Sequence, residues 1–134
     1  MGNDSNLDEA FADELVSVCR TTVGDRLRSI TYFDTTNEEQ IYLRDDLEPG
    51  ANIVGFANEE RSGFKSKRIY EDTELGDYQF TIRAFEHGYL TRVIHGYHGA
   101  FVTTDRLPTD RFEDLASAVD SVLGEYDTAW LRPD

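Results

Sequence analysis

The chain has little cysteine and no long apolar runs. Its one cysteine, Cys19, leaves no partner for an internal disulfide and favours a reducing compartment. No apolar run approaches the ~18 residues of a membrane span, and no segment resembles a signal peptide. There is no CxxC, HExxH, GxSxG or glycine-rich phosphate loop, so the usual motifs of metal, hydrolase and nucleotide chemistry are missing. These absences favour a cytoplasmic protein that is not an enzyme.

Lysine is also scarce, because only Lys65 and Lys67 are lysines among the thirteen basic residues. Twenty-seven acidic residues give a net charge of −14. Repulsion of this size weakens a compact state in dilute buffer, whereas about 1 M salt shortens the Debye length to roughly 3 Å and screens it. The composition therefore predicts a protein of a halophile cytoplasm, with an ordinary acidic protein as the alternative.

The composition still permits a packed core. The chain has 134 residues, of which 39% are hydrophobic, with eight Phe and seven Tyr. This size suits a single α+β domain over residues 1–134. Both ends are polar, and we predict flexible tails at residues 1–6 and 125–134, the second of which carries the only tryptophan, Trp130.

The most informative stretch is Tyr78–Thr104, in which apolar and polar residues alternate as in half-buried strands. Glycine-bearing turns divide it, and at His87-Gly88 we expect the glycine to take a positive φ. The stretch predicts an antiparallel meander of three strands: Tyr78–Phe85, Tyr89–His95 and Ala100–Thr104.

The rest of the chain supplies helices around a hairpin. Apolar residues at helical spacing predict helices at the two ends, and two short runs predict a β-hairpin. The stretch from residue 51 to 73 is least regular, with a helix expected first and an interruption at Ser62-Gly63. The predicted order is α–ββ–α–βββ–α, a five-stranded antiparallel sheet with helices mainly on one face. The expected elements are helix Phe11–Thr22, strands Leu27–Phe33 and Gln40–Leu43, helix Ala51–Arg61, the meander, and helix Phe112–Leu123.

Two resemblances follow from these patterns. Over Asp8–Leu123 the element order resembles the roadblock/longin type of profilin-like fold and, more loosely, the PAS type, which implies a fold but no function. Three segments, Val18–Asp25, Ile41–Leu47 and Glu74–Tyr78, resemble a family of small acidic haloarchaeal proteins. That family has no assigned activity, so the resemblance implies the compartment and a single domain only.

The chain has three histidines, and these are its only possible imidazole ligands for a metal ion. His95 and His98 lie three residues apart across a predicted turn, and His87 lies one hairpin away. A zinc site normally needs three or four converging ligands, and this spacing does not force convergence. We expect exposed hairpin histidines, with no metal and no cofactor.

One basic cluster stands out, made of Arg61, Lys65, Lys67 and Arg68 with Phe64 and Tyr70 between and beside them. Bases beside aromatics suit an anion, a nucleic acid or an acidic partner. The alternative, which we favour, is that the cluster offsets neighbouring acids, because high salt removes most of the gain from counterion release. The acids in question are Glu59, Glu60, Glu71 and Asp72; the paired acids Glu59-Glu60 are expected on a solvated surface.

The sequence favours a non-catalytic, homodimeric interaction module with an unidentified protein partner and no membrane contact. Both faces of the meander carry large apolar residues, and two end helices can cover only one of them. We expect a twofold interface through the sheet or the helix Ala51–Arg61, centred on Phe56, Phe85 or Tyr89. The alternatives are a sensor that holds a small ligand between sheet and helices, and a nucleic-acid-associated regulator that uses the basic cluster.

Overall fold

The computed structural model describes residues 7–48 and 53–126. The predicted order of elements is confirmed, and the irregular stretch forms two short helices that meet at Ser62-Gly63. The elements are α1 (Glu9–Val23), the 3-10 turn η1 (Gly24–Arg26), β1 (Leu27–Asp34), β2 (Glu38–Leu43), α2 (Ile53–Arg61), α3 (Gly63–Ile69), β3 (Thr81–Phe85), β4 (Gly88–His95), β5 (His98–Thr104) and α4 (Asp110–Gly124).

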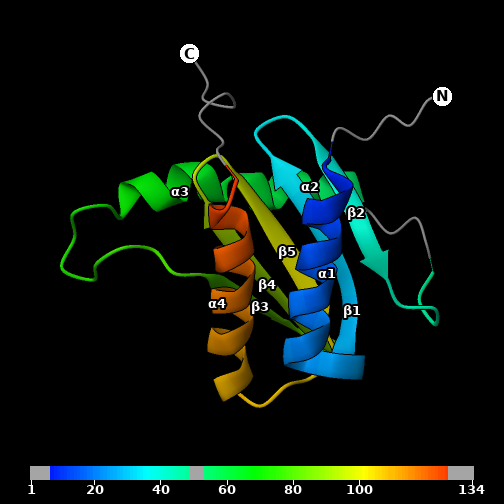
Figure 1. Cartoon of the computed structure of the whole chain (residues 1–134). Helices are drawn as coiled ribbons and strands as arrows, with labels where there is room; N and C mark the ends of the chain where they lie inside the picture. The colour runs from blue at the N-terminus through cyan, green and yellow to red at the C-terminus, as the bar shows by residue number, and fades with distance from the viewer. Residues whose placement is uncertain (1–6, 49–52, 127–134) are drawn as a thin grey trace.

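The five strands form one antiparallel sheet in the order β2-β1-β5-β4-β3, so β2 and β3 are its edges. Helices α1 and α4 lie side by side across one face, here called the front face (Figure 1). Helices α2 and α3 lie on the opposite, back face, near one end of the strands (Figure 1). The predicted coverage of one face by the two end helices is confirmed.

Local signals in the sequence explain α1. The Asp8 carboxylate accepts a hydrogen bond from the Ala10 N–H at 3.0 Å and caps the first turn. Gly24 ends the helix with φ +61°, a conformation that glycine adopts without steric cost. Between these ends, Phe11, Leu15 and Cys19 recur on one face and are buried.

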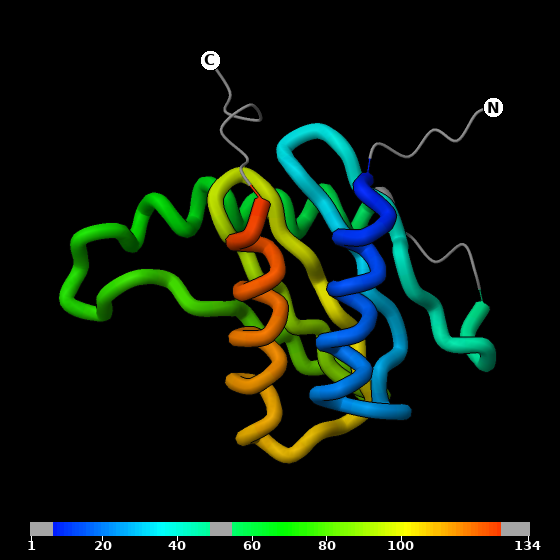
Figure 2. The backbone as a smooth tube through the Cα atoms, viewed as in Figure 1, coloured from blue at the N-terminus to red at the C-terminus, as the bar shows by residue number. Residues whose placement is uncertain are grey.

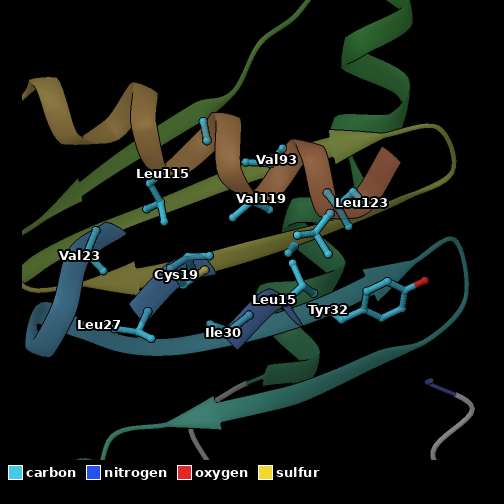
Figure 3. Packing of buried hydrophobic residues seen from close by; sticks show 14 of the residues in the cluster. Leu15, Cys19, Val23, Leu27, Ile30, Tyr32, Val93, Leu115, Val119 and Leu123 are labelled. Atoms are coloured by element: carbon cyan, nitrogen blue, oxygen red, sulfur yellow. The ribbon is translucent and has the colours of Figure 1, made fainter. Parts of the chain in front are cut away.

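The main core lies between this helix, α4 and the front face of the sheet (Figure 3). Leu115, Val119 and Leu123 of α4 meet β-branched residues of the sheet such as Val93. Cys19 is fully buried in this core, and burial raises the pKa of its thiol to about 12. The expected role of Cys19 as a small apolar core residue is confirmed.

Two details of the meander differ from the prediction. The first strand begins at Thr81 and not at Tyr78. The Tyr78 hydroxyl donates to the Arg92 carbonyl at 3.2 Å, and the Tyr78 ring lies under the Arg92 guanidinium. The expected positive φ at Gly88 is wrong, since Gly88 is not among the glycines with positive φ. Glycine is needed there because an added Cβ would lie 2.0 Å from the Thr104 carbonyl oxygen.

The predicted tails fall largely outside the described residues, as does Trp130. Tyr126 is described, and its ring packs edge-on against Phe11 with centroids 4.4 Å apart. Among the helices of residues 7–48 and 53–126, none is long and apolar enough to cross a membrane.

Candidate functional site

The back face of the sheet is only half covered. Helices α2 and α3 bury a small second core at one end, formed by Phe33, Ala57, Leu90, Ile94 and Phe101, with Phe64 packed against it. Beyond that core the same face opens into a hollow of about 530 Å³. The large apolar residues that line the hollow are Leu43, Leu47, Phe56, Phe85, Leu90 and Phe101.

Small side chains on the back face explain why the hollow exists. Ser29, Thr31 and Thr103 line it where bulkier residues would fill the space, and the hydroxyls of Ser29 and Thr103 hydrogen-bond to each other at 2.5 Å. These two residues are direct partners across β1 and β5. The Thr31 Oγ1 is buried and has no hydrogen-bond partner within the described part of the chain. The hollow therefore combines an apolar wall with a few hydroxyl groups, and it is also lined by Arg28, Gln40, Glu48, Glu86 and His87.

Two exposed phenylalanines border the hollow. Phe56 of α2 is 45% exposed and Phe85 at the end of β3 is 56% exposed. Both were candidate interface residues, and the structure brings them to the same surface. The third candidate, Tyr89, points its side chain to the front face, where its ring packs on Phe112 at 4.9 Å and under Arg106 at 5.4 Å. We call the hollow together with Phe56 and Phe85 the back-face surface.

A buried ionic network fastens α2 beside the hollow. Glu60 is only 2% exposed, and its carboxylate accepts hydrogen bonds from Arg83 Nε at 2.7 Å and Arg92 Nη1 at 3.2 Å. Arg92 is itself 5% exposed. The expectation that Glu59-Glu60 is solvated surface is therefore wrong for Glu60. The sequence did contain a signal for this burial, because Arg83 and Arg92 fall in neighbouring strands. An arginine on a covered face of a sheet needs an acidic partner.

A second charged group holds the other end of the sheet. Asp105 accepts hydrogen bonds from Arg44 Nη1 at 2.8 Å and Arg28 Nη1 at 3.0 Å. The hydrogen bond from Arg44 outweighs the opposing effect of desolvation and, together with the hydrogen bond from Arg28, holds the Asp105 pKa below its usual value. Arg28 also lines the hollow, so this group fixes β1 and the segment after β2 at its border.

The basic cluster divides into two parts. Arg61 belongs to the body of the protein, because its guanidinium contacts the Glu38 carboxylate and donates to the Asp34 carbonyl at 2.8 Å. Lys65, Lys67 and Arg68 lie on α3 and make no ion pair within residues 7–48 and 53–126. The structure thus does not bring the four predicted residues into one site.

The histidines also separate. His98 is buried against Phe11, and its Nε2 donates to the Leu123 carbonyl at 2.9 Å while its Nδ1 accepts from the Tyr32 hydroxyl at 3.1 Å. The expectation of exposed hairpin histidines is therefore wrong for His98. His95 pairs instead with Asp120 at 2.9 Å. In the part of the chain that the structure describes, no group of three or more His, Cys, Asp or Glu side chains is placed to hold a metal ion.

The burial of His98 predicts a dependence of stability on pH. Burial lowers the pKa of His98 below its ordinary value, and the Leu123 carbonyl opposes this only in part. The unfolded chain therefore binds this proton more readily than the folded chain, and the free energy of unfolding should fall as the pH drops below about 6.5. Urea unfolding at several pH values between 8 and 5.5 measures the slope of the free energy of unfolding against pH. This range lies above the usual pKa values of carboxylates, so their titration contributes little.

Replacing His98 tests the assignment. His98→Gln should lose most of the slope in this window, whereas His87→Gln should keep it, because the His87 side chain is 82% exposed. An unchanged slope in His98→Gln would remove His98 as the cause.

A family model described as a domain of unknown function (DUF7522) matches residues 13–124 of the chain. Comparison with curated proteins gives no significant match. Solved structures of the same fold do match, and the chain is similar to the gliding protein MglB from Thermus thermophilus, with 13% identity and a TM-score of 0.56 over 94% of this chain and 100% of that one.

Two further MglB structures are similar over almost the whole chain. One, from Myxococcus xanthus, has 14% identity and a TM-score of 0.58, with 93% of this chain and 98% of that chain covered. The other is an MglB with a tetrameric arrangement, with 12% identity and a TM-score of 0.60 over the same shares of the two chains. Identities this low establish the fold alone, and that fold is the roadblock type that the element order predicts.

Proposed function

The chain belongs to the DUF7522 family of domains of unknown function, and from the geometry of the back-face surface we propose that it is a non-catalytic interaction module that forms a homodimer. The observation that carries the proposal is the half-covered back face. A hollow of about 530 Å³ lies open beside two phenylalanines that are each about half exposed. Apolar surface gathered in this way is typical of interaction sites.

A second copy of the chain suits this surface. A twofold interface joins the same patch of two copies, so the patch must be complementary to itself. The half-exposed rings of Phe56 and Phe85 border the hollow, so that apolar surface of one copy would meet apolar surface of the other. An MglB of the same fold has a tetrameric arrangement, which supports self-association as a use of the fold.

The homodimer predicts a solution mass. Light scattering in molar KCl should give about twice the 15.3 kDa mass of the chain. Phe85→Glu and Phe56→Glu should each return the protein to the monomer mass, because a carboxylate buried in an apolar interface without a partner is strongly unfavourable. Since both side chains are exposed in the single chain, neither substitution should change the circular dichroism spectrum.

Ile82→Glu is the matched control. Ile82 is 39% exposed on β3, but its strand position places it on the opposite face from Phe85. This variant should remain dimeric. A monomer across the micromolar range for the unmodified protein would refute the homodimer.

A second candidate function is a sensor for a small ligand. The hollow lies within the usual range of ligand pockets, about 300–1,000 Å³, and combines apolar walls with the hydroxyls of Ser29 and Thr103. Native mass spectrometry of freshly purified protein separates the two. A monomer carrying added mass supports the sensor, and an unliganded dimer supports the interaction module.

We also propose that the protein works in the cytoplasm of a halophile. The net charge of −14 and the presence of only two lysines support it. The salt dependence of stability tests it, as argued below.

A further inference from the structure

Helix α3 and the residues after it form an arm that leaves the body of the protein. We define the α3 arm as residues 63–75; in Figure 2 it reaches beyond the edge of the sheet. Only its first turn is fastened, by Phe64 against Phe33 with ring centroids 5.5 Å apart and by Gly63 against the Arg92 guanidinium. Beyond it, Ser66 and Lys67 are half-buried, and the side chains of Lys65 and of residues 68–75 are exposed.

The bases of the arm are not neutralised by their neighbours. Within the described residues, Lys65, Lys67 and Arg68 make no side-chain hydrogen bond and no ion pair. The acids that the sequence offered as local partners are engaged elsewhere or also unpaired. Glu59 and Glu60 contact Arg83 and Arg92, and Glu71, Asp72 and Glu74 make no ion pair in the parts of the chain described.

The helix of the arm has a positive local charge. From Gly63 to Tyr70 there are three bases and no acid, so the local charge is +3 in a chain of −14, and the rest of the chain carries −17. Beside these bases lie the exposed apolar side chains of Ile69 and Tyr70, and Leu75 follows after the acids Glu71, Asp72 and Glu74. Ile69 is 65% exposed, Tyr70 52% and Leu75 86%.

We propose that the α3 arm docks on an acidic protein surface with an apolar centre. The inference rests on the proposed function as an interaction module and names the chemistry of its partner. Apolar side chains bordered by charges match the usual anatomy of a protein interface, with a buried centre and a polar rim. An acidic partner would complement the three unpaired bases.

The same observations argue against a nucleic acid. Of the exposed apolar side chains of the arm, Tyr70 has a ring on which a base could stack, whereas Ile69 and Leu75 have none. Arg61 is withdrawn from the cluster by Glu38 and Asp34. Three bases release few counterions, so the electrostatic gain that dominates binding to a phosphate backbone is small here.

Fluorescence anisotropy with a labelled peptide of glutamate and leucine tests the inference. The unmodified full chain should bind this peptide. The triple variant Lys65→Gln, Lys67→Gln, Arg68→Gln should bind about tenfold or more weakly, which corresponds to about 1.4 kcal/mol shared among three charged contacts. The double variant Ile69→Ser, Leu75→Ser should also bind more weakly, because the apolar centre of the contact is lost.

A matched control separates the arm from the overall charge. The triple variant Arg20→Gln, Arg26→Gln, Arg111→Gln lowers the net charge by the same three units at exposed positions away from the arm, and should bind the peptide almost as well as the unmodified chain. Equal weakening in both triple variants would show a bulk charge effect and overturn the inference. So would no binding of the peptide, or binding of only a single-stranded oligonucleotide or phosphatidylserine vesicles.

Light scattering keeps this test distinct from that of the homodimer. The arm variant should keep the mass of the unmodified protein, and Phe85→Glu should keep its affinity for the peptide. If the arm variant instead becomes monomeric, the arm belongs to the contact between copies and the inference is overturned. If the unmodified protein is monomeric but binds the peptide through the arm, the homodimer alone fails.

Discussion

Replacing Glu60 by alanine is expected to lower the free energy of unfolding by about 3–5 kcal/mol, the usual effect of removing one partner from a buried ion pair. The Glu60 and Arg92 side chains are 3% and 6% exposed and lie 3.2 Å apart between N and O atoms. Without the carboxylate, the guanidinium of Arg92 keeps hydrogen bonds to Thr81, Tyr78 and the backbone of residue 60, and no acidic partner among the described residues. For a chain of this length the loss corresponds to roughly 10–15 °C in the thermal midpoint.

Glu59→Ala provides the control, because it makes the same change one residue earlier on the same helix. The Glu59 side chain is 71% exposed and approaches Arg83 only to 3.9 Å. Its loss should change stability by less than about 1 kcal/mol. Glu60→Gln should fall between the two alanine variants, since it keeps the shape of the side chain and removes the charge. Equal midpoints for Glu59→Ala and Glu60→Ala would contradict the role assigned to the buried network.

The thermal midpoint is also expected to rise by many degrees between low salt and molar KCl. The chain carries −14, and much of this charge is exposed acid that meets no base in the described structure. Raising the salt concentration to about 1 M shortens the Debye length to roughly 3 Å and screens repulsion between such groups. Circular dichroism melts at several KCl concentrations measure the effect.

A charge-reduced variant tests the cause. Asp13, Glu74, Asp77 and Asp114 are exposed and make no ion pair within residues 7–48 and 53–126. Changing all four to their amides should raise the midpoint at low salt and reduce its dependence on KCl. A response to KCl that is flat in the unmodified protein would remove the halophile hypothesis.

The fold could be predicted because its signals are local. Helix α1 has its cap at Asp8 and its stop at Gly24, and β4 and β5 are runs of mostly apolar and β-branched residues between glycine-bearing turns. Each of these features depends on residues within one element, so the sequence contains it directly.

The site could be predicted only in part, because it depends on contacts between elements. Phe56 of α2 and Phe85 of β3 line the same hollow, while Tyr89 points to the front face because side chains alternate along β4. Glu60 looked like solvated surface because its arginine partners lie 23 and 32 residues away in the sequence. The hollow had no signal of its own, since it results from small residues on two strands that meet only in the folded sheet.

The unequal size of the two cores has a consequence for how the protein opens. Of the described residues, seventeen are buried in the front core and only five in the back core. Because resistance to local unfolding follows buried apolar contact, the backbone amides of α2 and α3 should exchange with deuterium through a partial opening. The amides of β1, β5, α1 and α4 should instead exchange only with complete unfolding. Helices α2 and α3, which carry Phe56 and the α3 arm, would then detach from the sheet and repack on it while the sheet, α1 and α4 stay folded.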